Sequence, residues 1–285
     1  MLWPLSALWP DAWGPFMRHE RWDSALFLHW PLPRAQVQAL LPAGLTVDTG
    51  ELLQEKEAVA WLGLVLLSEL GVGPAGCCRS CSPLVDHHGA NLRVYVRGPD
   101  GPGIYFLSLE CSSLLASAGA RLMAIPYWPG AMTRTTIEAT TEGGRRFQIT
   151  GRRCSCRCQG RTLRWKRFSS ALVSCSWAAA AADSNAALAA DHDDSSAEQW
   201  ASRTRFFLER YRVYTHRGGA LYSGSVLHRP WPVGPAELRQ LQQSLSGAIS
   251  GLPSQLGKPA HCCFSEGVGP VDFHMLRPSV DRASS

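Results

Sequence analysis

Lysine is nearly absent from this sequence. Of its 28 basic residues only Lys56, Lys166 and Lys258 are lysines, and the other 25 are arginines. A desolvated lysine can act as a nucleophile, whereas an arginine keeps its charge in proteins. Any mechanism that needs an amine therefore has three candidates, and each is flanked by residues typical of a solvated surface.

Long apolar runs are also missing. The longest, at residues 58–67, has ten residues, about half of what a helix needs to cross a bilayer. No arginine precedes Arg18, and prolines interrupt the first apolar pieces, so the start is typical of neither a secretory signal nor a transit peptide. We therefore expect a buried strand at 58–67, no membrane partner and a cytoplasmic location.

Positively charged residues are in small excess over negatively charged ones. The net charge is +5 over 285 residues, and the basic stretch around 152–168 has little aromatic support, so we predict no nucleic-acid partner. Hydrophobic residues make up 45% of the chain and charged residues 18%, which excludes global disorder.

The ten cysteines lack the arrangement of a disulfide framework, because most are clustered and the chain is neither short nor visibly secreted. We expect reduced thiols. Cys78 and Cys81, followed by His87 and His88, offer ligands for zinc. A single CxxC without a second pair is a weak signal, so we predict no metal and no cofactor.

Strand-like runs dominate the pattern. They do not alternate with the three expected helices, around 34–41, 111–124 and 235–249, which favours antiparallel α+β over parallel α/β. We expect a Trp- and Pro-rich extension at 1–18, one domain at 19–280 and a tail at 281–285. A low-complexity surface insert at about 177–200 interrupts the domain.

Five stretches in order resemble the YqjF-like family of the acetoacetate decarboxylase-like fold, at residues 26–49, 91–110, 119–128, 206–238 and 264–278. The resemblance implies a mainly antiparallel, partly closed β-barrel or cone with a few flanking helices and an interior pocket. The decarboxylases keep a Schiff-base lysine just after a Gly-x-x-Leu-x-x-x-Pro stretch. Here that stretch runs from Gly119 to Pro126, and Tyr127 follows it.

Two reactive groups implied by the resemblance are therefore missing. Tyr127 has no amine, which excludes Schiff-base decarboxylation at that position. Relatives carry Pro-Glu-x-Asn-x-Arg where this chain reads His88-Gly89-Ala90-Asn91-Leu92-Arg93, so Gly89 replaces a glutamate. We expect the fold of the decarboxylases without their chemistry.

Other polar residues could bind a ligand. Asn91, Arg93 and Tyr95 share one face of a strand, pointing either into the pocket or to water. If this face points into the pocket, Arg93 could bind a carboxylate, and Asn91 and Tyr95 could orient it. Arg121 and Tyr127 flank the position comparable to the lysine, and Tyr127 could donate a hydrogen bond to a developing enolate oxygen.

Two main functional hypotheses remain open, and a zinc-dependent variant is a weaker third. In the first, the protein has a pocket for a small apolar carboxylate or keto compound, and any catalysis is lysine-independent enolate chemistry such as isomerisation. In the second, a barrel filled with side chains serves as a non-catalytic structural or interaction protein. The partner in the first is a small-molecule ligand, and either hypothesis leaves a homo-oligomer open.

Overall fold

The computed structural model describes residues 14–50, 59–76, 85–122, 125–137, 146–159, 162–171, 173–179 and 194–279. Strands dominate these residues, and three α-helices accompany them: α2 (Arg34–Gln38), α3 (Leu114–Leu122) and α5 (Asp194–Leu208). None of the helices in these ranges is long and apolar enough to cross a bilayer.

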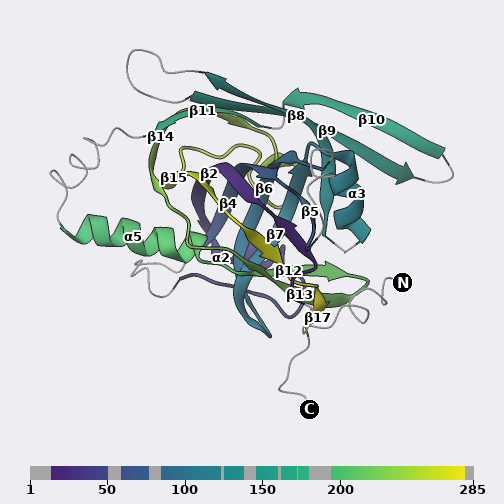
Figure 1. Ribbon diagram of the computed structural model, residues 1–285, viewed down its shortest axis with the longest axis horizontal. Helices are drawn as coiled ribbons and strands as arrows, with labels where there is room; N and C mark the ends of the chain where they lie inside the picture. Colours follow the sequence, from purple (N-terminus) through teal and green to yellow (C-terminus); the bar gives the residue numbers. More distant parts are fainter. Residues whose placement is uncertain are drawn as a thin grey trace.

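The strands form one strongly curved, mostly antiparallel sheet that is not closed (Figure 1). They are β1 (Met17–His19), β2 (Arg21–Pro33), β3 (Thr46–Val47), β4 (Val59–Leu70), β5 (Gly73–Pro74), β6 (His87–Gly98), β7 (Gly101–Cys111), β8 (Tyr127–Ile137), β9 (Arg146–Gln159), β10 (Thr162–Ala171), β11 (Val173–Ala179), β12 (Arg212–Arg217), β13 (Ala220–Leu227), β14 (Gly234–Gln243), β15 (His261–Val268), β16 (Val271–Phe273) and β17 (Arg277–Pro278).

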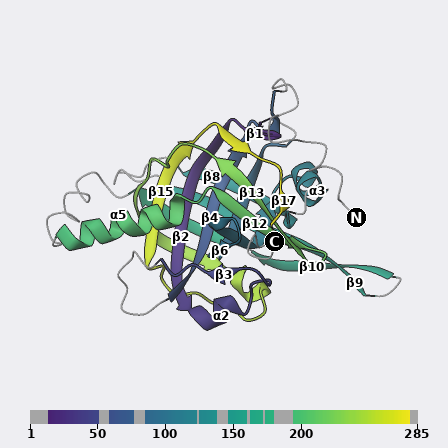
Figure 2. The same cartoon turned by 90° about the horizontal axis from the view of Figure 1, so that it is seen from below.

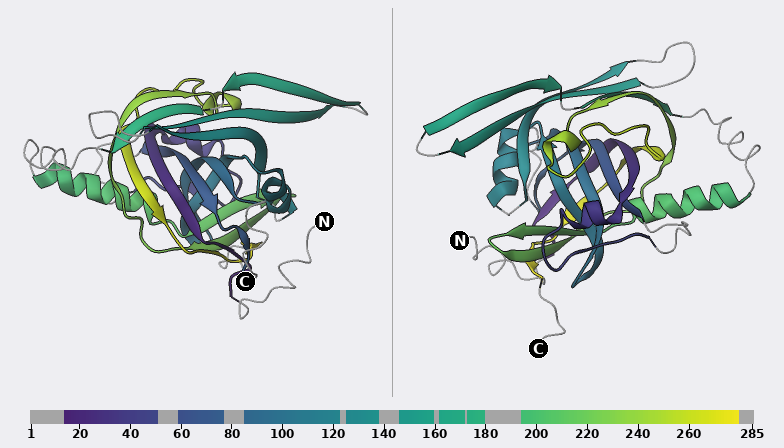
Figure 3. Two further views of the ribbon diagram at one scale, coloured as in Figure 1. Left: turned by 45° about the horizontal axis from the view of Figure 1, so that its top comes forward. Right: turned by 180° about the vertical axis from the view of Figure 1, so that it is seen from behind.

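The centre of the sheet runs in the order β15-β2-β4-β6-β7, with every neighbouring pair antiparallel. Two parallel pairings continue it from β7, one to β8 and one to β12. The β8, β9 and β10 strands extend past one side of the sheet, while α5 and α3 lie at opposite ends (Figures 2 and 3). The predicted antiparallel α+β fold, a partly closed cone with a few flanking helices, is confirmed.

Both faces of the central strands are apolar. On β2, Leu26 and Leu28 belong to one buried cluster, while Ala25 and Phe27 belong to a second cluster on the opposite face. The same alternation follows along β4 and β6. A sheet covered on both faces explains why residues 58–67 form a continuous apolar run without spanning a membrane.

One predicted helix is wrong. Residues 235–249 carry apolar residues at helical spacing, yet β14 and a short 3₁₀ turn (Ser246–Ala248) occupy this range. The register of β14 against β11 shifts between Leu238 and Gln240, which is a β-bulge. Because the bulge inserts one residue, Leu238 and Leu241 both pack on the core although they are three residues apart. The spacing of a bulged strand therefore imitates a helix.

The predicted insert at 177–200 ends in regular elements on both sides. Its first residues belong to β11, which reaches Ala179, and its last belong to α5, which begins at Asp194. Residues 180–193 lie outside the described ranges. Cys111, Cys262 and Cys263 are free thiols, as expected.

A chain of buried hydrogen bonds ties α5 to the sheet. Thr204 on α5 donates to the Trp200 carbonyl, so its oxygen must accept from His261 Nε2, 2.9 Å away. His261 Nδ1 then accepts from His29 Nδ1 at 3.1 Å, and His29 Nε2 accepts from the Tyr95 hydroxyl at 2.8 Å. Both histidines must be neutral for this order to hold.

Acid should therefore destabilise the fold. Burial and the nearby Arg203 lower the pKa of His261 from 6.5 to about 4. A histidine kept neutral in the fold stabilises it above pH 6.5, and this contribution is lost as the pH falls towards 4. The loss should be roughly 3 kcal/mol at most. Urea unfolding between these pH values should show it, and a His261→Gln variant should have a shallower pH dependence. Identical pH dependences would contradict the assignment.

Candidate functional site

Two adjoining cavities lie beside the central strands. The outer cavity has a volume of about 740 Å³, and the inner one about 80 Å³, enough for a few water molecules or one small polar head group. Four residues line both, namely Phe16, Ile125, Tyr127 and Phe273. Tyr127 therefore stands at the junction between the two spaces.

Polar side chains enter the inner cavity from several elements. Glu69 comes from β4, Asn91 and Arg93 from β6, Tyr127 from the start of β8, and Arg210 from the segment after α5. On β6 the intervening residues belong to the apolar cluster on the other face of the sheet. The two-residue period therefore brings Asn91 and Arg93 to one side, as the sequence predicts.

Arg93 has no carboxylate partner among the described residues. One guanidinium nitrogen donates to the Phe207 carbonyl at 3.1 Å, and the group lies 5.6 Å from the centre of the Tyr95 ring. Its Nε is buried without a hydrogen-bond partner, as is Oδ1 of Asn91. Arg210, also at the inner cavity, differs because it donates to buried Asp48 at 2.9 Å. Arg93 is thus the uncompensated cation of this site.

Gly63 makes room for this arrangement. It pairs with Arg93 across β4 and β6, and a Cβ at position 63 would lie 3.0 Å from the Tyr95 hydroxyl and 3.3 Å from Arg93 Cγ. A larger residue would push both side chains away from their present positions.

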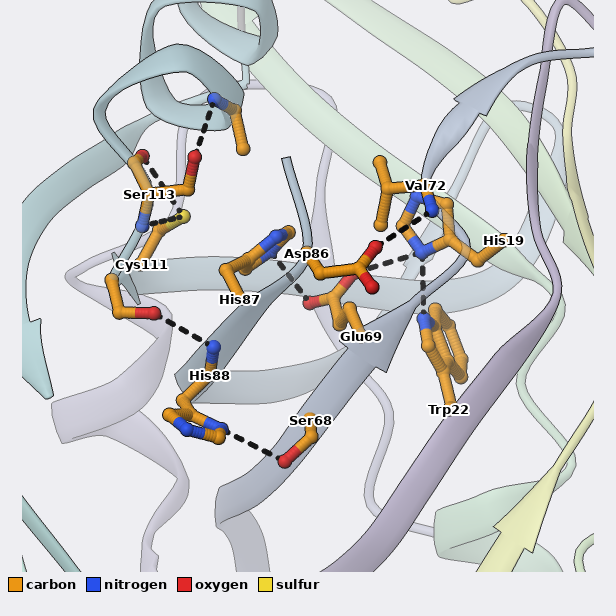
Figure 4. A network of polar contacts seen from close by, with 12 residues as sticks. His19, Trp22, Ser68, Glu69, Val72, Asp86, His87, His88, Cys111 and Ser113 are labelled. Atoms are coloured by element: carbon orange, nitrogen blue, oxygen red, sulfur yellow. Dashed lines mark hydrogen bonds and ion pairs between the residues drawn. The ribbon is translucent and has the colours of Figure 1, made fainter. Parts of the chain in front are cut away.

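Glu69 lies between two histidines (Figure 4). His87 Nδ1 must donate to the Val85 carbonyl, 2.7 Å away, because a carbonyl only accepts. Its Nε2 faces Glu69 Oε1 at 3.4 Å, and a carboxylate oxygen only accepts as well. His87 Nε2 makes no hydrogen bond, so its contact with Glu69 is an ion-pair contact only. A protonated His87 can donate from Nδ1 and carry the charge that faces the carboxylate, so Glu69 and His87 form a buried ion pair.

The pKa values follow from this geometry. Burial disfavours the charged imidazolium of His87. The attraction of the neighbouring Glu69 carboxylate outweighs this effect and raises the pKa of His87 to about 11. Burial likewise opposes ionisation of Glu69, and its two histidine neighbours nevertheless hold the pKa of that carboxyl far below its ordinary value. The second neighbour is His19, whose Nδ1 is 3.0 Å from Glu69 Oε2 and 3.0 Å from Trp22 Nε1.

Tyr127 is linked to the same group. Burial, followed by the charge of Glu69 and a hydrogen bond to it, raises the pKa of the Tyr127 hydroxyl well above 10. Its ring meets His87 edge-on, with 6.1 Å between the ring centres. Tyr127 is therefore a neutral phenol, able to donate a proton in a hydrogen bond but not to act as a phenolate.

Glycine occupies position 89, where the family resemblance implies a glutamate. A different carboxylate, that of Glu69, lies close to this position. A Cβ at Gly89 would lie 3.2 Å from Glu69 Oε1, so the carboxylate comes from the neighbouring strand into the space beside Gly89. No local motif marks Glu69; only the pairing of β4 with β6 brings it there.

The other predicted site residues lie elsewhere. Tyr95 is buried but hydrogen-bonds His29 and does not line the described cavities. Arg121 is exposed, donates to the Tyr127 carbonyl at 2.7 Å and packs over the Trp128 ring. His87 pairs with Glu69 and His88 with Ser68, while Cys78 and Cys81 lie outside the described residues. No group of potential metal ligands occurs among the described side chains.

Comparison with known proteins assigns the family. Residues 19–269 match DUF2071, a family of uncharacterized conserved proteins. The chain belongs to this family. It is also 27% identical to the protein YqjF of Bacillus subtilis (strain 168) over 231 residues, which covers 80% of this chain and 78% of YqjF. The predicted YqjF-like resemblance is confirmed.

Solved structures of low sequence identity share the fold. An acetoacetate decarboxylase from Legionella pneumophila superposes with a TM-score of 0.53 at 12% identity, covering 95% of this chain and 89% of that one. The enduracididine biosynthesis enzyme MppR, complexed with pyruvate, superposes with a TM-score of 0.53 at 11% identity, covering 94% of this chain and 91% of that one. The acetoacetate decarboxylase-like fold of this DUF2071 member is therefore established.

The Glu69–His87 ion pair can be tested by spectroscopy of the protonation state of His87. With its pKa raised to about 11, His87 should remain an imidazolium between about pH 6 and pH 9. In a Glu69→Gln variant it should lose its extra proton near or below neutral pH, because burial then acts without a counter-charge. Nitrogen-15 chemical shifts of the imidazole, assigned with a His87→Gln variant, report this directly. A neutral His87 at pH 7 in the unmodified protein would contradict the ion pair.

Proposed function

We propose that this DUF2071 protein binds a small carboxylate or keto compound in the inner cavity, with Arg93 as the anchor for the negative charge. The observation that carries the proposal is the half-buried guanidinium of Arg93, whose buried Nε has no hydrogen-bond partner and which has no carboxylate partner among the described residues. Taking an unpaired charge out of water costs several kcal/mol, and a bound anion would remove that cost. Asn91 lies two residues away on the same face and has a buried amide oxygen to offer to a hydroxyl or a protonated group.

The polar groups define an orientation for such a ligand. A carboxylate bound near Glu69 would meet a negative charge, whereas at Arg93 it meets a positive one, so the acid group belongs at Arg93. The opposite end of the ligand then lies near Tyr127. A carbonyl oxygen there can accept a hydrogen bond once the Tyr127 hydroxyl turns from Glu69 to the ligand.

The structural relatives support this ligand class. They include acetoacetate decarboxylases, named for a keto acid, and MppR, which is complexed with pyruvate. These ligands and activities belong to those proteins, and at identities of 11–12% they show only that the shared fold accommodates such compounds.

Schiff-base chemistry has little support in this site. Among the described residues, neither cavity is lined by a lysine, and Lys258 is exposed. If the site turns its ligand over, polarisation of a carbonyl by Tyr127 would favour enolate chemistry such as isomerisation. A borohydride-stable adduct between a keto acid and any lysine would contradict this part of the proposal.

Substitution of Arg93 tests the anchor. Calorimetric titration with butyrate and with 2-oxobutyrate should show binding to the unmodified protein. Arg93→Gln should weaken it by about tenfold to a hundredfold, the cost of losing a charged hydrogen bond. Arg93→Lys should recover part of the affinity, because it keeps the charge but not the paired donors.

Arg97→Gln is the matched control. Arg97 lies on the same strand, but its side chain is 57% exposed and pairs with Asp48 outside the cavity lining. This variant should bind butyrate like the unmodified protein. Equal affinities for the Arg93→Gln and unmodified proteins would overturn the proposed anchor.

A further inference from the structure

The outer cavity is much larger than the inner one. Its volume is about 740 Å³ against about 80 Å³, and most of its lining is apolar. Helix α3 supplies only small or apolar residues to it: Leu115, Ala116, Gly119 and Ala120. Its size and lining are those of a typical small-molecule site, which is mostly apolar with a few polar groups.

The outer cavity has polar residues on the side of β1, namely Arg18, His19 and Glu20, and small or apolar residues on the side of α3. His87 and Tyr127 meet the outer cavity from β6 and β8, and Tyr127 is also part of the inner lining. An occupant of both cavities would therefore have one end among charged and hydrogen-bonding groups and the other against α3. The chemistry that fits is a molecule with a charged head and an apolar tail.

The surface of α3 adds a second, independent observation. Leu114 and Leu115 are 73% and 59% exposed, which is unusual for large apolar side chains on a helix of nine residues. Leu115 also lines the outer cavity, so the apolar lining continues out to the surface at this helix. An apolar molecule at this surface would therefore contact residues that also line the cavity.

We infer that the outer cavity holds the hydrocarbon chain of an aliphatic carboxylic acid whose acid group is bound at Arg93. The inference rests on the proposed function and narrows it from small carboxylates to acids with an extended apolar chain. The chain supplies the binding free energy by leaving water, and the uncompensated Arg93 fixes which end enters first.

A series of ligands tests the inference. Titration with butyrate, hexanoate, octanoate and decanoate, each below its micelle-forming concentration, should give an affinity that rises with length. Each methylene transferred from water into the cavity should tighten binding by about three- to fourfold until the cavity is filled.

A substitution on α3 locates the chain. A Cβ at Gly119 meets no atom within 4 Å, so a phenylalanine there can take up cavity space without a clash at its first carbon. Gly119→Phe should leave the affinity for butyrate unchanged. It should remove most of the additional affinity that octanoate and decanoate have over butyrate. Ala118→Phe is the matched control. Ala118 is next to Gly119 on the helix, but it is exposed and does not line the cavity, so binding should still depend fully on the length of the acid.

The outcomes separate the two proposals. If butyrate does not bind the unmodified protein, the proposed function fails. If butyrate binds through Arg93 but the longer acids bind no more tightly, the function stands and the inference is overturned. A length dependence that is the same in Gly119→Phe as in the unmodified protein would also overturn it, because the chain would then lie elsewhere.

Discussion

Charges inside the apolar interior of this sheet each need compensation, because an isolated buried ion costs several kcal/mol. The protein meets this constraint by pairing strands in a fixed register. The register of β4 against β6 brings His87 opposite Glu69. The segment that follows α5 brings Arg210 to Asp48. Arg93 is the exception among these charges. Its contacts are a carbonyl oxygen and aromatic rings, which stabilise a guanidinium but do not neutralise it.

This distribution of charge gives the two cavities their character. The Glu69–His87 pair is neutral overall and keeps the junction at Tyr127 polar without attracting a second anion. Arg93 makes the inner cavity positive at one end. Beyond Tyr127 the space widens and becomes apolar where α3 covers it. One end of the site is thus suited to an acid group and the other to hydrocarbon, which is the basis of the proposed ligand class.

Much of this could be predicted from sequence, and the failures have physical causes. The two-residue period on β6 is enough to place Asn91 and Arg93 on one face, because alternation is local to one strand. Glu69 could not be found, since its role depends on which residue of another strand lies opposite. The helix expected at 235–249 failed because a bulge in β14 gives a strand the spacing of a helix. Pairing partners, which no single-strand pattern contains, decide both failures.

The most direct test of the central claim is a crystal structure of the protein with decanoate at saturating concentration. We predict that both carboxylate oxygens lie within hydrogen-bond distance of the Arg93 guanidinium, with the hydrocarbon chain passing Tyr127 towards Gly119. A carboxylate bound away from Arg93, or density for the ligand outside both cavities, would contradict it.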